Sequence, residues 1–375
     1  MSKVVKVLHM APLGSGGISK LTVTINGLID LKKVKFDYLV FKDEKTFYED
    51  IVYKYAAEKK LVDVSKYKNK LLLYWKKYQL TYKMLLKNKY DVVHVDASTP
   101  MDVVIGMAAK KAGVNYVIIH SHIAGDNKHS WFRSFYFDVC RRKMIGVFDD
   151  YIAISDSAAE FMFPTSIVKE KKYRIVSNGI VADEYHYDET VRQEWRKRLN
   201  IENEFLVGHV GRFSKEKNHK FIIEVFSRLI QIVPTAKLLL IGEGGLKPEI
   251  EKLVIEKGLS EKVIFYGISH EIPKLMLAMD AFIFPSHYEG LGIAAVEAQC
   301  SGLPLFCSKG IPEATRLTPV FNYVDGADPE NWARAIASSQ GAERKDYVDE
   351  VKNAGFDIIH IAKEMEEYYI EKAEK

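Results

Sequence analysis

The chain has 375 residues, of which 47% are hydrophobic and 28% charged, an ordinary composition for a globular protein. It is too long for one ordinary core and has no run of about 18 uncharged apolar residues, so we expect two domains, no transmembrane span and no secretory signal. The formal net charge of +4 hides an asymmetry: residues 1–180 carry 30 Lys and Arg against 18 Asp and Glu, whereas the remainder carries 24 against 32. The first half should therefore be attracted to an anionic partner.

The three cysteines, Cys140, Cys300 and Cys307, do not have the spacing of metal ligands. An odd, sparse set is typical of a reducing compartment and not of a disulfide framework. We therefore expect a cytoplasmic protein.

Short apolar runs alternate with helix-compatible segments along the first half of the chain. The opening VVKVLHMA is followed by the glycine turn PLGSGGIS and by helical spacing in LTVTINGLI. Further strands are expected at 36–41, 91–96, 115–122 and 151–155. Because these strands do not alternate polar and apolar residues, they are expected in a parallel sheet covered by helices on both faces.

The pattern breaks into a polar loop at 174–190, after which a second series of strands and helices begins. We therefore expect an α/β protein with two doubly wound parallel-sheet domains, at 1–182 and 183–355. The amphipathic C-terminal helix, about 356–375, should pack back on the first domain. Ligands bind such sheets at the carboxyl ends of their strands, so residues at strand ends are the candidates for function.

Three motifs stand at such strand ends. In GSGGIS (14–19), Gly16 and Gly17 do not fit a dinucleotide or Walker pattern, but their backbone N–H groups could face an anion; a simple tight turn is the alternative. In GRFSKEKN (211–218), Arg212 and Lys217 could clamp a diphosphate, and a solvated loop is the alternative.

The third motif is PSHYEGLGIAAVEAQCSG (285–302), which contains two isolated glutamates. Glu289 lies beside a glycine turn, and Glu297 falls in the second turn of an expected helix. The alternative is a surface helix in which Glu297 has no binding role. The small and apolar neighbours of Glu297 argue instead that it is buried with a partner. A carboxylate there could accept hydrogen bonds from vicinal hydroxyls such as those of a ribose.

Together these motifs resemble the Glu-x7-Glu signature of family four of the retaining glycosyltransferases with the GT-B fold. The resemblance covers nearly the whole chain, through GGIS, YIAISDSAAEF (151–161), IVSNGIV (175–181), VGRFSKEKN (210–218), LLLIGEG (238–244), VIFYGI (263–268) and GIPEA (310–314). It implies two Rossmann-like domains facing across a cleft. The first would bind the acceptor and the second a nucleotide diphosphate sugar.

The resemblance also implies a role for each matching residue. Glu297 would bind the ribose and Glu289 the transferred sugar, while Arg212 and Lys217 would neutralise the diphosphate. The remaining donor contacts implied are Gly16 and Gly17 at the phosphates, Gly267 and Ile268 at the base, and the backbone of Gly290, Leu291 and Gly292. His122 matches a strand-end histidine near the donor sugar, and His120 and Asn178 are further candidates.

Retaining transfer needs either a covalent carboxylate intermediate or front-face attack. No carboxylate of the first domain is compellingly placed as a nucleophile, so we expect front-face transfer in which the leaving diphosphate helps to take the acceptor proton. The chain has no Asp-x-Asp motif, so we expect no metal and no cofactor. Arg212 and Lys217 would neutralise the diphosphate in place of a metal ion.

Residues 65–90 hold eight lysines and no acidic residue, with Leu, Tyr, Trp and Met interleaved, and 128–143 mixes aromatic and basic residues. Such helices can lie on an anionic membrane, and a solvated helix face is the alternative. No nucleic-acid motif accompanies them, so no nucleic-acid partner is expected. The expected location is therefore the cytoplasm, at the inner face of the cell membrane.

The sequence thus predicts a hexosyltransferase of surface polysaccharide or capsule biosynthesis. It would use a nucleotide sugar, with UDP as the expected carrier, and a lipid-linked or glycan acceptor. A protein glycosyltransferase and a GT-B-like partner subunit without turnover are the alternatives. The presence of both glutamates, Arg212 and Lys217 argues against the inactive subunit.

Overall fold

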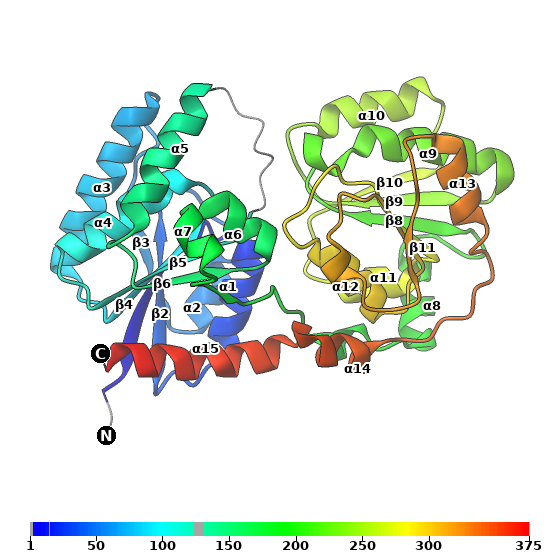
Figure 1. Ribbon diagram of the computed structural model, residues 1–375. Coiled ribbons are helices and arrows are strands. Elements are labelled where there is room, and N and C mark those ends of the chain that lie inside the picture. The colour runs from blue at the N-terminus through cyan, green and yellow to red at the C-terminus, as the bar shows by residue number, and fades with distance from the viewer. Residues whose placement is uncertain (1–2, 15, 124–130, 375) are drawn as a thin grey trace. The chain divides into compact units, whose positions relative to one another are not determined.

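The computed structural model describes residues 3–14, 16–123 and 131–374, with residues 131–133 described by their backbone alone. The chain divides into two compact units, Met1–Gly179 with Ile358–Lys375, and Ile180–Asp357 (Figure 1). The chain first passes from the first unit to the second after Gly179, slightly before residue 182, where we expected the first domain to end. Ile180 belongs to the second unit because its N–H donates to the carbonyl of Phe356 and because it pairs with Asp357 in a parallel bridge, both far along the chain.

The first unit is built on a seven-stranded parallel sheet in the order β3-β2-β1-β4-β5-β6-β7. Its strands are β1 (Val5–Met10), β2 (Val34–Val40), β3 (Lys59–Leu61), β4 (Val92–Ala97), β5 (Tyr116–Ser121), β6 (Asp150–Ala153) and β7 (Arg174–Ile175). The strand order reverses direction between β1 and β4. The carboxyl ends of these two strands therefore form the edge where such sheets bind ligands.

The helices of the first unit are α1 (Gly17–Leu28), α2 (Glu49–Lys54), α3 (Lys70–Lys87), α4 (Val103–Lys111), α5 (Trp131–Met144), α6 (Asp156–Met162), α7 (Thr165–Lys169) and α15 (Ile358–Ala373). The last of these is the C-terminal helix, which contacts α1, β1, β2 and β4 and runs along the first unit (Figure 1). Its buried side chains, among them Ile361, Met365 and Tyr369, recur at helical spacing. The C-terminus thus contributes to the core of the N-terminal unit.

The second unit has a six-stranded parallel sheet in the order β10-β9-β8-β11-β12-β13, and the order reverses between β8 and β11. Its strands are β8 (Leu206–Val210), β9 (Lys237–Ile241), β10 (Val263–Gly267), β11 (Ala281–Phe284), β12 (Leu305–Cys307) and β13 (Phe321–Tyr323). Its helices are α8 (Glu189–Arg198), α9 (His219–Ile232), α10 (Lys247–Glu256), α11 (Ile272–Ala278), α12 (Ile293–Cys300), α13 (Pro329–Ala337) and α14 (Val348–Val351). The predicted pair of doubly wound parallel sheets is confirmed.

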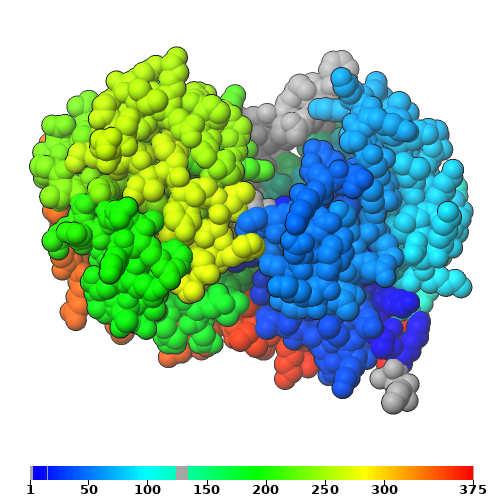
Figure 2. Space-filling view, turned by 180° about the vertical axis from the view of Figure 1, so that it is seen from behind, coloured from blue at the N-terminus to red at the C-terminus, as the bar shows by residue number. Residues whose placement is uncertain are grey.

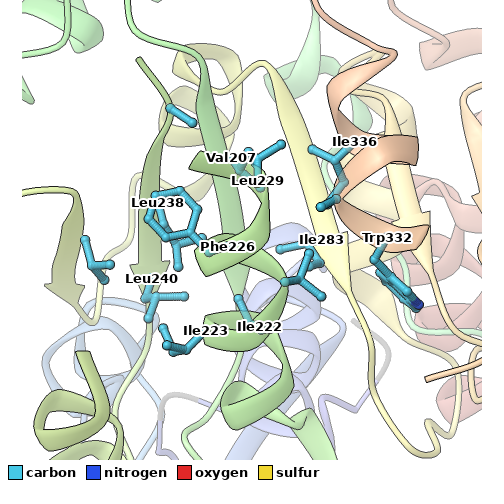
Figure 3. Packing of buried hydrophobic residues seen from close by; sticks show 14 of the residues in the cluster. Val207, Ile222, Ile223, Phe226, Leu229, Leu238, Leu240, Ile283, Trp332 and Ile336 are labelled. Atoms are coloured by element: carbon cyan, nitrogen blue, oxygen red, sulfur yellow. The ribbon is translucent and has the colours of Figure 1, made fainter. Parts of the chain in front are cut away.

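The core of the second unit shows why its strand ends are held firmly. Ile222, Phe226 and Leu229 lie on one face of α9 and pack in the same buried cluster as the apolar strands (Figure 3). Trp332 and Ile336 of α13 belong to the same cluster. Burying side chains of this size contributes about 1.5–3 kcal/mol each, so the sheet is a rigid base for the loops at its carboxyl edge.

Among the described residues, none of the helices combines the length and the apolar character that a membrane span requires.

Candidate functional site

The loop after β11 is fixed by close backbone contacts at the reversal point of the second sheet. The N–H of Glu289 donates to the carbonyl of Gly310 at 3.0 Å. A Cβ on Gly310 would come within 2.4 Å of the carbonyl oxygens of Ser286 and His287, so only glycine allows the two loops to approach this closely. Gly292 then caps α12 with φ +78°, a conformation that also favours glycine.

Lys217 and Glu289 meet at this edge, although 72 positions separate them in the sequence. The ammonium of Lys217, in the short 3-10 turn Lys215–Lys217 after β8, donates to Oε1 of Glu289 at 2.6 Å. The same ammonium lies 4.8 Å from the centre of the Phe284 ring at the end of β11. Only 21% of the Lys217 side chain and 14% of the Glu289 side chain are exposed, so the pair is largely withdrawn from solvent.

Arg212, at the start of the same loop, is exposed, and none of the ion pairs between described residues involves it. A hydrogen bond from Ser214 and, more weakly, the charge of Arg212 lower the pKa of Glu216 below its ordinary value. The N–H of His287 donates to the Glu216 carbonyl at 2.8 Å, which ties the β8 and β11 loops together. The exposed guanidinium is thus a cation that an anionic ligand could engage.

Glu297 lies inside α12 and is only 3% exposed. The hydroxyl of Tyr185 donates to its Oε1 at 2.6 Å. Burial, followed by the charge of Glu297, raises the pKa of Tyr185 well above its ordinary value, so the phenol remains a donor. The burial inferred from the small neighbours of Glu297 is therefore present. The partner was missed, because Tyr185 lies in the polar loop 174–190, whose sequence does not indicate a buried tyrosine.

Gly267 ends the edge strand β10 with φ +82°, and its carbonyl accepts from the N–H of Gly242 at 2.8 Å. The following residue, Ile268, is 41% exposed. In the chain after Glu289, Leu291 is buried, and its carbonyl accepts from the Thr315 hydroxyl at 2.7 Å. The donor-binding residues predicted in the second half thus all lie at the end of β10, on the loops after β8, β10 and β11, or on α12.

The other predicted residues belong to the first unit. Gly16 caps α1 and Gly17 begins it; both are exposed, and a Cβ on either would meet nothing within 4 Å. Ser15, between the two halves of the glycine turn, lies outside the described residues. Asn178 is partly buried, and its Oδ1 has no hydrogen-bond partner among the described residues.

His120 and His122 differ from the expectation that strand-end histidines face an open site. Both are buried, and Nε2 of His122 lies 3.0 Å from Oδ1 of Asp96. The same carboxylate lies 2.8 Å from Nδ1 of His9, and His94 stacks on His9 with ring centres 4.6 Å apart. Sequence reasoning missed His9, His94 and Asp96, although HVD and HSH at neighbouring strand ends were a usable signal. A donor contact of His122 remains a prediction.

Burial in this cluster favours the neutral forms of His94 and His120 beside an ionised Asp96. Burial lowers the pKa of His94 to about 3 and lowers that of His120 well below its ordinary range. Burial alone would raise the pKa of Asp96, but the surrounding imidazoles and the hydrogen bonds of His122 and His9 hold it well below its usual range.

Comparison with known proteins gives matches to both halves of the chain. Residues 24–184 match the model of "Glycosyltransferase Family 4", and residues 191–344 match that of "Glycosyl transferases group 1". EpsF of Bacillus subtilis (strain 168), named as a glycosyltransferase, is 26% identical over 361 residues, which cover 94% of this chain and 93% of EpsF. The UDP-Gal:alpha-D-GlcNAc-diphosphoundecaprenol alpha-1,3-galactosyltransferase of Escherichia coli is 25% identical over 243 residues, 60% of each chain.

Among solved structures, Anabaena HepE in complex with UDP and glucose is similar with a TM-score of 0.75. The match covers 98% of this chain and 99% of HepE at 18% identity. At this identity the likeness concerns the fold alone.

Proposed function

Because the chain belongs to the family-four type of glycosyltransferases with the GT-B fold, we propose that it transfers a sugar from a nucleotide diphosphate sugar with retention of configuration. The proposed donor is a UDP-sugar, and the proposed acceptor is a lipid-linked saccharide or growing glycan of a surface polysaccharide. The UDP complex of HepE and the lipid-linked substrate in the name of the Escherichia coli relative support this choice.

The observation that carries the proposal is the meeting of Lys217 and Glu289 at the reversal point of the second sheet. A lysine held there supplies a fixed positive charge at the edge where doubly wound sheets bind nucleotides. Glu289 orients this ammonium and offers a carboxylate to sugar hydroxyls. Arg212 adds a second cation that can bind phosphate oxygens in a bidentate manner.

This arrangement suits a reaction in which negative charge grows on the leaving diphosphate. As the bond between the sugar and the phosphate oxygen breaks, Lys217 and Arg212 would stabilise the departing charge more strongly than the bound donor. Such preorganised charge accelerates the chemical step. Front-face attack would deliver the acceptor oxygen on the side the diphosphate leaves, and the diphosphate would take the acceptor proton.

We further propose that the first unit rests on an anionic membrane through α3. Leu71, Trp75 and Leu86 are between 50% and 59% exposed on this helix, beside the exposed Lys70 and Lys83. The helix lies on the surface of the first unit (Figure 2, light blue). Exposed apolar side chains among lysines are typical of helices that lie in a lipid interface.

Not every lysine of this basic stretch is free to serve that contact. Lys77 is partly buried, with its ammonium 3.8 Å from Asp102 and 4.3 Å from the Phe41 ring centre. The first residues of the second basic stretch, 128–130, lie outside the described residues. The membrane proposal therefore rests on α3, at the inner face of the cell membrane.

A panel of nucleotides tests the donor site by thermal unfolding, because a ligand at 100 times its Kd stabilises the folded state by about 2.7 kcal/mol. Nucleoside diphosphates and their sugars should raise the melting temperature, and the donors that do so should be hydrolysed slowly without acceptor. No response to any nucleoside diphosphate would overturn the proposal.

A further inference from the structure

The buried histidines and Asp96 occupy one face of three neighbouring strands. In the parallel register His9 pairs with His94 between β1 and β4, and Asp96 pairs with His120 between β4 and β5. Since side chains alternate along a strand, residues two apart, such as His94 and Asp96, share a face. The C-terminal helix α15 packs against β1 and β4 (Figure 1). The side chains of the cluster are buried.

Three side chains bring ligand atoms close together. One ligand atom from each of His94, Asp96 and His120 lies within 4.8 Å of the other two. Oδ1 of Asp96 lies 3.7 Å from Nε2 of His94 and 4.0 Å from Nδ1 of His120. Bonds of about 2.0–2.1 Å to a tetrahedral zinc ion separate ligand atoms by roughly 3.3–3.5 Å. The two distances to Asp96 would therefore have to shorten by several tenths of an ångström, and the histidine nitrogens, which lie within 4.8 Å of each other, would have to approach by up to about 1.5 Å.

The nitrogen atoms of this cluster are incompletely satisfied. Nε2 of His94, the atom that lies 3.7 Å from Oδ1 of Asp96, is buried without a hydrogen-bond partner among the described residues. On His120 the unpartnered nitrogen is Nε2, on the far side of the ring from the Nδ1 that lies near Asp96. Leaving such an atom unpaired costs about 1–3 kcal/mol. The other nitrogen of His94, Nδ1, lies 2.8 Å from the hydroxyl of Tyr369 on α15. An outer hydrogen bond of this kind commonly fixes the ring of a metal-binding histidine.

The charges around Asp96 also favour a bound cation. Within the described part of the chain, the recorded ion-pair contacts of Asp96 are all to histidines, and none is to a lysine or arginine. A buried carboxylate without a cation is costly.

We propose that His94, Asp96 and His120 bind one divalent transition-metal ion of the zinc class inside the first unit. The ion would supply the missing positive charge, bond β4 to β5, and keep a water molecule as its fourth ligand. Its role is structural and separate from the donor diphosphate, whose neutralisation is assigned to Arg212 and Lys217 of the second unit.

The test uses the full chain without a histidine tag, stripped with a chelator, supplied with Zn²⁺ and then desalted. Elemental analysis should find about one zinc ion per chain, and Zn²⁺ should raise the melting temperature. His94→Gln and His120→Gln should each weaken zinc binding at least about tenfold. His219→Gln, which changes a buried histidine of the second unit, is the matched control and should bind zinc like the wild type.

Absence of retained zinc, or equal retention by a folded His94→Gln/His120→Gln double variant, would overturn the proposal. If the variants fail to fold, Co²⁺ binding to the wild type decides. An intense visible spectrum of a tetrahedral Co²⁺ site would support the proposal, whereas a weak octahedral spectrum or no spectrum would refute it. None of these measurements depends on nucleotide-sugar transfer.

Discussion

Tyr185→Phe is the sharpest single change available at the proposed donor site, because it removes one hydroxyl and leaves the ring. That hydroxyl is buried and donates at 2.6 Å to Oε1 of Glu297. A hydrogen bond to a charged group contributes about 1.5–3 kcal/mol, so the free energy of unfolding should fall by about that amount. Glu297 would also lose the contact that fixes its orientation, and we expect about a tenfold loss of nucleotide affinity, about 1.4 kcal/mol.

Calorimetric titration with UDP and with 2′-deoxy-UDP separates positioning from general destabilisation. If Glu297 binds the ribose hydroxyls, the wild type should prefer UDP, and Tyr185→Phe should lose part of that preference. Tyr53→Phe is a matched control, because Tyr53 donates to Glu49 at 3.0 Å in an exposed pair of the first unit. It should bind both nucleotides like the wild type. Unchanged UDP affinity and preference in a folded Tyr185→Phe protein would refute the reasoning.

Three further outcomes are expected. Lys217→Met removes the ammonium that lies 2.6 Å from Glu289. It should lower kcat for nucleoside diphosphate release by roughly 10²-fold or more, with a smaller change in donor affinity. An unchanged kcat would count against stabilisation of the leaving diphosphate by Lys217. A variant with Lys70, Lys83 and Lys87 changed to Glu should co-sediment less with anionic vesicles at low salt than the wild type. The control variant, with Lys220, Lys252 and Lys274 of the second unit changed to Glu, should co-sediment like the wild type. Equal binding by both variants would contradict membrane contact through α3. Burial lowers the pKa of His219 to about 4, so the unfolded chain takes up a proton that the folded chain does not. Above about pH 6.5, protonation of this histidine in the unfolded chain does not reduce the free energy of unfolding. Between about pH 6.5 and 4 it lowers the free energy of unfolding by about 1.4 kcal/mol for each pH unit that the pH drops. Urea unfolding of His219→Gln should therefore show a shallower pH dependence than the wild type, and an identical slope would contradict this assignment.

The fold was predictable because its signals are local. Non-alternating apolar runs such as DVVHVD, separated by helical segments, already imply buried parallel strands. The sequence also indicated that the C-terminal helix would pack on the first domain, and α15 belongs to that unit. The exact crossing at Ile180 could not be predicted, because it depends on a bridge to Asp357, far along the chain.

The candidate site was predictable as a set of strand-end motifs but not as a set of contacts. That Lys217 pairs with Glu289 follows from the adjacency of β8 and β11, which no local pattern reveals. The same holds for Tyr185 and Glu297, where a loop residue contacts a helix 112 positions away. The histidine cluster depends on the registers of three strands, so single motifs suggested exposed site residues where the structure has buried ones.

Release of nucleoside diphosphate from a nucleotide sugar measures the proposed transfer most directly. NMR spectroscopy of the purified chain with UDP-sugars and a lipid-linked saccharide acceptor should show loss of the donor anomeric signal, appearance of UDP and a product with the anomeric configuration of the donor. Lys217→Met should slow all three changes together. A chain that binds nucleotides but releases no nucleoside diphosphate from any nucleotide sugar, or a product with inverted configuration, would contradict retaining transfer at this site.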